Sequence, residues 1–508
     1  MGQPDTRQKQ DNHVVAISQS DASWHGSPNL TKLTLSLGFL TMFGSAVGYD
    51  GSMSNGLLAL PQWTSFMGQP AGAWLGFINA IYWVSFGLGI PFAAWSADRF
   101  GRKFTVYLGF IPLVIGTALE TAAPNDAVFI VGRAILGFPS AVFGNVVPLL
   151  VAECAHPKYR GVLTSFYFTG FYIGATIAAW ATFGTRNYTT SWAWRVPCIL
   201  QLLCPLVGLI GLIPCPESPR WLVSKDRVEE AREILKTYHS ATQDDPIVET
   251  QMLEIQAAVV DASEVRTAGY ADMFRTRPNL HRVAITVTLG IFSQWVGNGV
   301  VSYYLSLVLN TVGLTTVTEQ TLISGCLQIW NWIFAIAGAM AVERFGRRKL
   351  FLLSFAIMLV SYIVITACSG SFAQSGHRAV GMAVVPFLVI YFAGYDIAVT
   401  PLQVAYPVEI WPYHLRSQGL GLAWLSMLIG VIFNVFVNPI ALDAIGWKYY
   451  FVFVALLMVY GALIYFLFPE TRGLSLEQID TVFQDGAPSS TVKVYSEEDK
   501  PTKDHLHH

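Results

Sequence analysis

Charged residues are scarce in this chain. They make up 13% of its 508 residues, against about a quarter in a typical soluble domain. Hydrophobic residues make up 53% and aromatic residues 13%. So little charge excludes an ordinary soluble domain of this length, and the apolar and aromatic content excludes an intrinsically disordered chain. The net charge of −2 and the lack of a basic patch give no indication of a nucleic-acid partner.

The sequence also lacks the motifs of several common enzyme classes. It contains no His-Glu-x-x-His zinc motif, no Gly-x-Ser-x-Gly nucleophile motif and no phosphate-binding P-loop. Its six cysteines show no CxxC pairing or metal-ligand spacing, so we expect small core residues without disulfides. We therefore expect neither an enzyme nor direct ATP drive, and no metal or organic cofactor.

Most of the charge lies in three segments. Residues 1–32, 217–282 and 470–508 hold 6, 21 and 12 of the 64 charged residues, and the other 371 residues hold only 25. Between these segments lie twelve apolar stretches long enough to cross a lipid bilayer as helices. Their expected limits are 33–52, 73–96, 104–123, 127–151, 161–183, 195–214, 283–309, 320–341, 350–369, 379–405, 417–440 and 447–468. We predict an all-α polytopic membrane protein with twelve transmembrane helices.

Lysine and arginine in the short loops set the expected orientation. With a cytosolic N-terminus, the inner loops contain the basic clusters at 99–103 and 344–349, whereas the outer loop 53–72 contains no charge. We therefore expect both termini and the segment 215–282 in the cytosol, and the plasma membrane as the location. Asn187 begins a glycosylation sequon in a predicted outer loop.

Three motifs of the first half recur in the second. Residues 98–103 echo 343–349, the Glu153…Arg160 pair echoes Glu409…Arg416, and the Pro-Glu-Ser-Pro-Arg at 216–220 echoes the Pro-Glu-Thr-Arg at 469–472. The offsets are 245, 256 and 253 residues. We predict two homologous six-helix bundles, 33–214 and 283–468, joined by a helical linker, 215–282, and flanked by the tails 1–32 and 469–508. Such bundles can rock about a site between them.

These motifs resemble the sugar porter family of the major facilitator superfamily over about residues 35–480. The resemblance rests on the paired Arg-Phe-Gly-Arg loops, the Pro-Glu-Ser-Pro-Arg after span 6 and the Pro-Glu-Thr-Arg-Gly after span 12. Within the family, residues 192–201 and 293–305 are most similar to fungal lactose and cellodextrin permeases. The resemblance implies the major facilitator fold and secondary active transport of a sugar, and we expect a monomeric functional unit.

Ionisable residues inside the spans are functional candidates by default. Asp50 lies in the outer half of span 1, and Arg133 in span 4 is its candidate cation. In proton-coupled sugar porters an Asp at this Tyr-Asp-Gly position carries the proton beside a span 4 Arg, and both residues match. A structural cap near the membrane surface is the alternative for Asp50. Asp396 in span 10 is a second candidate, as a proton site, a substrate acceptor or a structural residue. We expect Glu120, at the outer end of span 3, to have no function.

Polar and aromatic side chains in spans 7, 8 and 11 are the candidate sugar contacts: Gln294, Asn298, Tyr303, Gln328, Asn331, Trp424 and Asn434. Gln294 and Asn298 are four residues apart and should share a helical face, with Gly297 and Gly299 allowing local bending. The resemblance places Gln294 and Asn331 at positions that contact sugar. For any single amide, hydrogen bonding between helices is the alternative.

The chain departs from the hexose-transporter pattern at several positions that contact sugar in the family. Ser293 replaces a Gln of span 7, Phe168 a Gln of span 5 and Val404 a Trp of span 10. The losses favour a wider or less polar site. Lactose- or cellobiose-like disaccharides are therefore the first expected substrates and hexoses the second. A carrier or exporter of a non-sugar metabolite and a transporter-like nutrient sensor are the alternatives.

The resemblance also implies an inner gate of charges at the cytosolic span ends, where opposite charges can pair between the two bundles. Its expected members are Asp98, Arg102, Glu153, Arg160, Glu343, Arg347, Glu409 and Arg416. Exposed pairs are worth about 0–1 kcal/mol each, which suits a gate that opens in every cycle. Positive-inside anchoring is the alternative, but it does not account for the matched Glu153 and Glu409.

Overall fold

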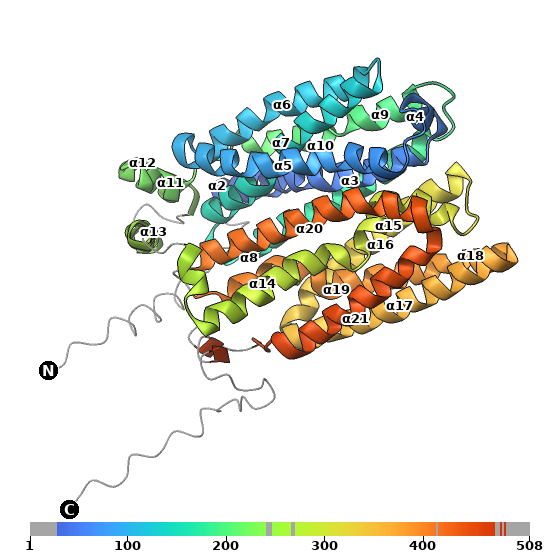
Figure 1. Ribbon diagram of the computed structural model, residues 1–508. Helices are drawn as coiled ribbons and strands as arrows, with labels where there is room; N and C mark the ends of the chain where they lie inside the picture. The colour runs from blue at the N-terminus through green and yellow to red at the C-terminus, as the bar shows by residue number, and fades with distance from the viewer. Residues whose placement is uncertain are drawn as a thin grey trace, which may run out of the picture.

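The computed structural model shows two bundles of long helices (Figure 1). It describes residues 28–239, 246–265, 270–412, 415–472, 478–479 and 482–483. Most of the two expected tails therefore lies outside the described residues. Within those ranges every regular element is a helix, as the apolar stretches predicted.

The N-terminal bundle consists of six membrane-crossing units. They are α2 (Pro28–Leu40) continued by η1 (Thr41–Gly44) and α3 (Ser45–Leu58), then α5 (Gly72–Phe100), α6 (Arg102–Ala122), α7 (Asp126–Cys154), α8 (Pro157–Thr185) and α9 (Trp192–Leu200) continued by α10 (Leu203–Leu212). The short α4 (Pro61–Phe66) lies between the first two units.

The C-terminal bundle has the same plan. Its units are α14 (Arg277–Trp295) continued by α15 (Asn298–Asn310), then α16 (Val317–Phe345), α17 (Arg347–Ser375), α18 (Arg378–Met382) continued by α19 (Val384–Ile410), α20 (Arg416–Ile445) and α21 (Tyr450–Leu467). The 3₁₀ turns η2 (Tyr270–Phe274) and η4 (Gly446–Tyr449) precede the first and the last unit.

Eleven stretches of the described chain are long and apolar enough to cross a membrane. The last, Arg416–Leu467, contains 52 residues and comprises α20, η4 and α21. As a single helix it would be about 78 Å long, more than twice the ~30 Å hydrocarbon core of a bilayer. The chain instead turns back at η4 (Figure 1), so this stretch is two spans and the predicted number of twelve is confirmed.

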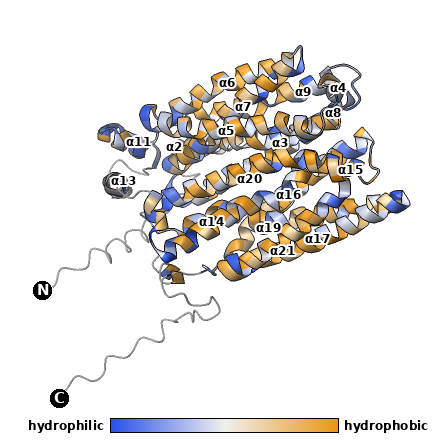
Figure 2. Ribbon diagram, in the orientation of Figure 1, coloured by the Kyte–Doolittle hydropathy of each residue, from blue (hydrophilic) through white to orange (hydrophobic). Residues whose placement is uncertain are grey.

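The helices of both bundles are mostly hydrophobic along their middle and more hydrophilic at their ends (Figure 2). Large side chains such as Leu88 and Phe466 are 73% and 79% exposed. In water such a surface would aggregate, whereas in a bilayer it is solvated by lipid. Burial of apolar side chains therefore does not by itself hold the helices together, and packing and polar contacts between helices become decisive.

The two bundles touch mainly through three pairs of helices among the described residues. α3 packs against α15, α5 against α20 and α8 against α16. Three hydrogen bonds between buried side chains of the described residues cross between the bundles. Two link neutral groups, from Asn55 Nδ2 to Ser324 Oγ at 3.3 Å and from Asn79 Nδ2 to Tyr304 Oη at 3.2 Å, and the third joins Tyr172 to Asp396.

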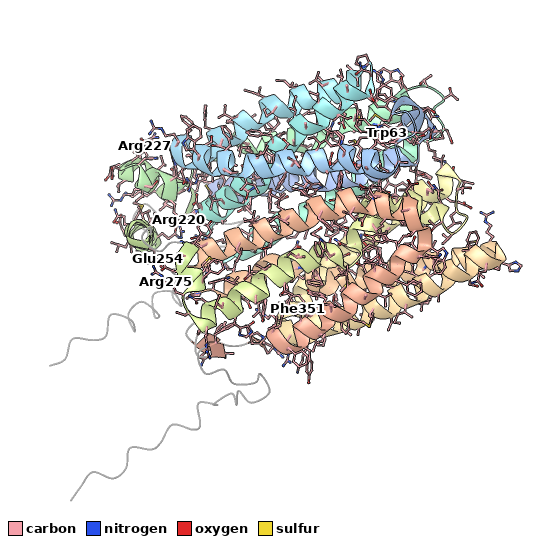
Figure 3. The ribbon with its side chains drawn as sticks, in the orientation of Figure 1. Trp63, Arg220, Arg227, Glu254, Arg275 and Phe351 are labelled. Carbon is pink, nitrogen blue, oxygen red and sulfur yellow. The ribbon has the colours of Figure 1, made fainter. Side chains whose placement is uncertain are left out.

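The linker between the bundles folds as three helices, α11 (Pro219–Ser224), α12 (Val228–His239) and α13 (Pro246–Val265), at one end of the protein (Figure 1). We call this the linker end. Figure 3 labels Arg220 and Glu254 there and Trp63 at the opposite end. Apolar residues of the linker form a small separate core, in which Ala231 and Leu235 are fully buried.

His239 joins the linker to the end of α7. One ring nitrogen lies 3.1 Å from the Cys154 carbonyl oxygen and the other lies 2.8 Å from Gln251 Oε1. The side chain is 5% exposed. Burial lowers the pKa of His239 below its ordinary value of 6.5, and the charge of Arg160 lowers it further. The folded linker therefore favours the neutral ring.

The attachment of α12 should consequently weaken in acid. Below about pH 6.5 the detached His239 binds a proton and the attached one does not, so detachment is favoured as the pH falls toward the lowered pKa. Hydrogen exchange of α12 amides should rise by about tenfold for each unit by which burial lowers that pKa. The control His239→Gln keeps the hydrogen bonding but cannot titrate, so the acid-induced rise should disappear. An equal rise in both proteins would contradict this role.

Candidate functional site

Asp50 and Arg133 form a buried ion pair inside the N-terminal bundle. The Arg133 Nη1 and Nη2 atoms donate to the two Asp50 carboxylate oxygens at 3.1 and 3.3 Å. Arg133 Nε also donates to the Ile78 carbonyl oxygen at 3.0 Å. The ring of Tyr82 lies against the guanidinium, with its centre 5.8 Å from Arg133 Cζ. The side chains of Asp50 and Arg133 are 6% and 3% exposed. The structure therefore brings together the two residues expected to handle the proton.

The glycines around Asp50 explain how a carboxylate reaches this position. A Cβ on Gly48 would lie 1.9 Å from the Phe171 carbonyl oxygen, so only glycine allows α3 to approach α8 so closely. A Cβ on Gly51 would lie 3.2 Å from the ring of Tyr303. Tyr303 comes from α15 of the other bundle and also packs edge-on against Trp83. Asp50 thus lies directly beside the helix that carries candidate substrate residues.

Span 7 is broken between α14 and α15. Gly297 has φ of +103°, a left-handed conformation that ends α14, and α15 restarts at Asn298. Three tyrosine hydroxyls bind the carbonyls freed by the break: Tyr362 donates to Gly297 at 2.8 Å, Tyr391 to Val296 at 3.0 Å and Tyr395 to Ser293 at 2.8 Å. The predicted bending at Gly297 is confirmed. The expectation that Gln294 and Asn298 share one helical face is wrong, because the break lies between them.

The candidate substrate amides fall into two groups. Asn434 uses both ends of its amide within the C-terminal bundle, donating to the Gln294 carbonyl and accepting from Asn438. In contrast, Asn298 Oδ1, Asn331 Oδ1 and Gln403 Oε1 are buried without a hydrogen-bond partner among the described residues. Such oxygens are costly unless water or a ligand satisfies them.

Gln403 was not among the residues predicted from the sequence. It lines a small cavity with Trp424 and with Ser293 and Val404, two of the positions at which the chain departs from the hexose-transporter pattern. Gln328, one turn from Asn331 on α16, is buried like it. Ser293 of span 7 and Val404 of span 10 therefore line the same small cavity as Trp424 of α20.

Asp396 ties the two bundles together. Tyr172 of α8 donates to Asp396 Oδ1 at 2.6 Å, and Thr400 donates to the same oxygen at 2.8 Å. Asp396 is 1% exposed, and its Oδ2 has no hydrogen-bond partner among the described residues. Sequence reasoning identified Asp396 but not Tyr172, because nothing in the pattern of span 5 distinguishes this tyrosine from a core aromatic residue.

The gate residues of the first half form a cluster within the N-terminal bundle at the linker end. Arg102 bonds Glu153 through Nε at 3.0 Å and approaches Asp98 at 3.4 Å. Glu217 of the Pro-Glu-Ser-Pro-Arg motif accepts the backbone N–H of Arg102 at 3.1 Å, and Ser218 donates to Glu153. The motif therefore caps the start of α6 and completes the ion pair.

The second half repeats this cluster in the C-terminal bundle. Arg347 Nη2 lies 2.8 Å from Glu409 Oε1. Glu470 accepts the backbone N–H of Arg347 at 2.8 Å, and Thr471 donates to Glu409 at 2.9 Å. The glycine before each arginine is left-handed, with φ of +103° at Gly101 and +89° at Gly346. The internal repeat therefore extends to single hydrogen bonds.

For Arg102 and Arg347 these contacts differ from the expected pairing between bundles. The described ion pairs of Arg102 and Arg347 stay within their own bundle, because α6 and α17 begin beside the ends of α7 and α19. They are also largely buried, with Arg102 and Glu153 side chains 11% and 7% exposed, and breaking a buried pair costs about 3–5 kcal/mol. Arg160 and Arg416 begin α8 and α20 at the same end. The side chain of Glu343 lies outside the described residues.

Comparisons with known proteins agree with this architecture. The sequence model of the family of sugar (and other) transporters matches residues 36–483. The hexose transporter HXT13 of Saccharomyces cerevisiae is 27% identical over 451 residues, which cover 84% of this chain and 78% of that protein. The sugar transporter STL1 of the same yeast is 30% identical over 404 residues, which cover 78% and 70%.

A solved structure shares the fold. The inward open form of the xylose transporter XylE from E. coli superposes with a TM-score of 0.74 at 20% identity, over 89% of this chain and 99% of XylE. The range matched by the family model includes both bundles, the linker and the two charge clusters. This chain therefore belongs to the family of sugar (and other) transporters, within the major facilitator superfamily.

Proposed function

We propose that this chain takes up a sugar together with a proton, by alternating access to a site between its two bundles. The observation that carries the proposal is the close approach of α15 to the residue next to Asp50, because a Cβ on Gly51 would lie 3.2 Å from the ring of Tyr303. The helix segment that holds the carboxyl group thus packs against the helix that presents Asn298. Among the similar proteins, HXT13 and STL1 are named as hexose and sugar transporters, and XylE is described as a proton:xylose symporter.

In this mechanism a proton from the outer side adds to a carboxylate oxygen of Asp50. The neutral carboxyl no longer attracts Arg133 as a charge, so the pair loosens beside Tyr303 and the α3–α15 contact is free to change. Sugar bound to residues of α15 and α16 acts on the same α3–α15 contact from the C-terminal bundle. Moving one charge through 100 mV supplies about 2.3 kcal/mol, enough for about fifty-fold accumulation of a neutral solute. Asp396 is the second candidate proton site, at the Tyr172 contact.

We assign the substrate site to the amides of Gln294, Asn298, Gln328 and Asn331. Trp424 and Tyr303 supply aromatic faces, and Gln403 adds an acceptor that has no hydrogen-bond partner in the part of the chain that the structure describes. Ser293 and Val404 are smaller than the residues at these positions in hexose transporters, and this loss of volume favours a disaccharide of the lactose or cellobiose type, with a hexose as the second choice. Phe168, where the family has an amide, is 49% exposed, and this apolar face is the observation that favours a non-sugar metabolite instead.

The orientation follows from the charge of the loops. We propose that the linker end faces the cytosol, because the basic loops at 99–103 and 344–349 lie there, and that the protein works as a monomer in the plasma membrane. Asn187 is exposed just beyond α8, at the opposite end. It is therefore the proposed glycosylation site on the outer surface.

Asp50→Asn tests the proton role. The change keeps the size of the side chain but removes its titratable carboxyl, so we expect accumulation against a gradient to fall to a ratio of about one while exchange of labelled sugar continues. The measurement is uptake from a sugar panel in yeast without its own sugar carriers, with and without an uncoupler. Asp226→Asn is the matched control, because that residue is exposed in the linker between α11 and α12, away from the spans, and its change should leave accumulation intact.

Two outcomes would contradict these assignments separately. Accumulation by the Asp50→Asn variant, with Asp396 intact, would remove Asp50 from the proton pathway. No uptake of any sugar by the unmodified protein at the cell surface would instead reject the sugar and favour a non-sugar metabolite.

Val404→Trp tests the substrate class. An indole at this position should fill the space shared with Ser293 and Trp424, and should lower disaccharide uptake by about tenfold, equivalent to ~1.4 kcal/mol, without lowering hexose uptake. The ratio of the two initial rates is the measurement. Val404→Leu adds less volume and should leave the ratio unchanged. An equal fall for both sugars would show that the residue acts through packing alone.

Gly297→Ala tests the break in span 7. A Cβ there would lie 2.2 Å from the Tyr362 hydroxyl, on a backbone that disfavours side chains, so we expect a loss of about 2–4 kcal/mol in stability. The melting temperature of the purified protein in detergent is the measurement. Gly38→Ala is the control, because no heavy atom would lie within 4 Å of its Cβ. A Gly297→Ala protein that melts like the control would contradict the structural role of the break.

A further inference from the structure

Arg133 faces two carboxylates, and the proposed proton mechanism uses only one of them. Its Nη1 atom lies 3.1 Å from Asp50 Oδ1 and 3.6 Å from Glu120 Oε1. Glu120 is 0% exposed, and Asp50 and Arg133 are 4% and 2% exposed. Glu120 was expected to sit at the membrane surface without a function. The structure places it in the interior, against the same guanidinium nitrogen that Asp50 binds.

Glu120 is held in this position from its other side. Gln201 Nε2 donates to Glu120 Oε2 at 2.8 Å, from the turn between α9 and α10. Glu120 Oε1 has no hydrogen bond among the described residues, and its contact is the longer ion pair with Arg133. Glu120 Oε2 is therefore held by Gln201, while Glu120 Oε1 lies next to the Arg133 guanidinium without a hydrogen bond to it.

The charges of this cluster do not balance when both carboxylates are ionised. Arginine stays protonated in proteins, so Asp50, Glu120 and Arg133 together carry −1 in a buried site. The cluster becomes neutral when it holds one proton. The other titratable or charged groups around it are Tyr49 on α3, Tyr82 on α5, Cys198 and Arg195 on α9, and Tyr303 on α15. Arg195 lies outside the ion pairs, where it donates to the Ala123 carbonyl oxygen.

We propose that Glu120 is the alternate counter-ion of Arg133, which holds the guanidinium while Asp50 carries the transported proton. The proton adds to an Asp50 oxygen, the cluster changes from −1 to 0, and Arg133 exchanges its bidentate pair with Asp50 for a pair with Glu120. No charge is left buried without a partner at any stage, which would otherwise cost several kcal/mol. This assignment rests on the proposed proton coupling and makes Glu120 a positioning residue for it.

Glu120 also sets how readily Asp50 takes up its proton. A second negative charge at the guanidinium favours the protonated form of Asp50, because the proton removes the excess charge. Glu120→Gln keeps the shape and can keep the contact with Gln201, but it removes that charge. Protonation of Asp50 would then leave Arg133 without a counter-ion, so a higher proton concentration is needed.

The first test is the pH profile of sugar uptake. In Glu120→Gln, half-maximal uptake should need an external pH lower by about one unit, whereas Glu120→Asp should stay close to the unmodified protein. Collapse of uptake by an uncoupler in the unmodified protein checks the proton coupling itself, so a failure of the proposed function is seen independently. An unshifted profile in Glu120→Gln with coupling intact would overturn the role of Glu120.

The second test needs no transport. Asp50→Asn imitates the protonated carboxyl, so Glu120 alone should then balance Arg133. We expect the melting temperature of the double variant Asp50→Asn/Glu120→Gln to fall about 5 °C beyond the sum of the two single changes, because only the double variant leaves the guanidinium unpaired. Additive changes would show that Glu120 does not replace Asp50 and would overturn the proposal.

Discussion

A permanent positive charge buried within a bundle of apolar helices is the constraint on which this structure depends. The guanidinium of Arg133 cannot lose its proton, and the surrounding helices bury it almost completely. The bundle therefore brings carboxylates from α3 and α6 to one side chain of α7. The glycines of α3 contribute to this pairing, since they let α3 pack closely enough for Asp50 to reach Arg133.

The rest of the site is organised by neutral hydrogen bonds. The break in span 7 exposes backbone carbonyls inside the protein, and hydroxyls of α17 and α19 bind them. Between the bundles the contacts of Asn55, Asn79 and Tyr172 are also made by uncharged donors. Neutral contacts of this kind are modest in strength, about 0.5–1.5 kcal/mol each. A protein whose halves must separate repeatedly benefits from many such contacts in place of a few strong ones.

The spans and their pairing into two halves were predictable because a bilayer requires long apolar helices and because the repeated motifs are local in sequence. Asp50 and Arg133 were predictable as a pair because charges inside spans are rare. The partners of the gate arginines were not, since sequence spacing identifies the end of a helix but not which neighbour lies beside it. Glu120 was misjudged for a similar reason: a carboxylate two residues from the end of α6 looks exposed in the sequence, and its burial depends on α9 and Gln201, which pack against it.

The twin clusters at the linker end have a further consequence. In each bundle a motif glutamate and the hydroxyl residue after it bind the ion pair at the helix ends of that same bundle. These residues are Glu217 with Ser218 in the first half and Glu470 with Thr471 in the second. Dissolved salt screens charges of this kind where they reach water, and there it acts on the cohesion of each half. Most described hydrogen bonds that join one half to the other link neutral groups, as those of Asn55 and Asn79 do, while Asp396 and Arg186 each contribute one that involves a charged group. Salt at the linker end is therefore expected to act mainly on how rigid each half is, and less on the buried contacts between the halves.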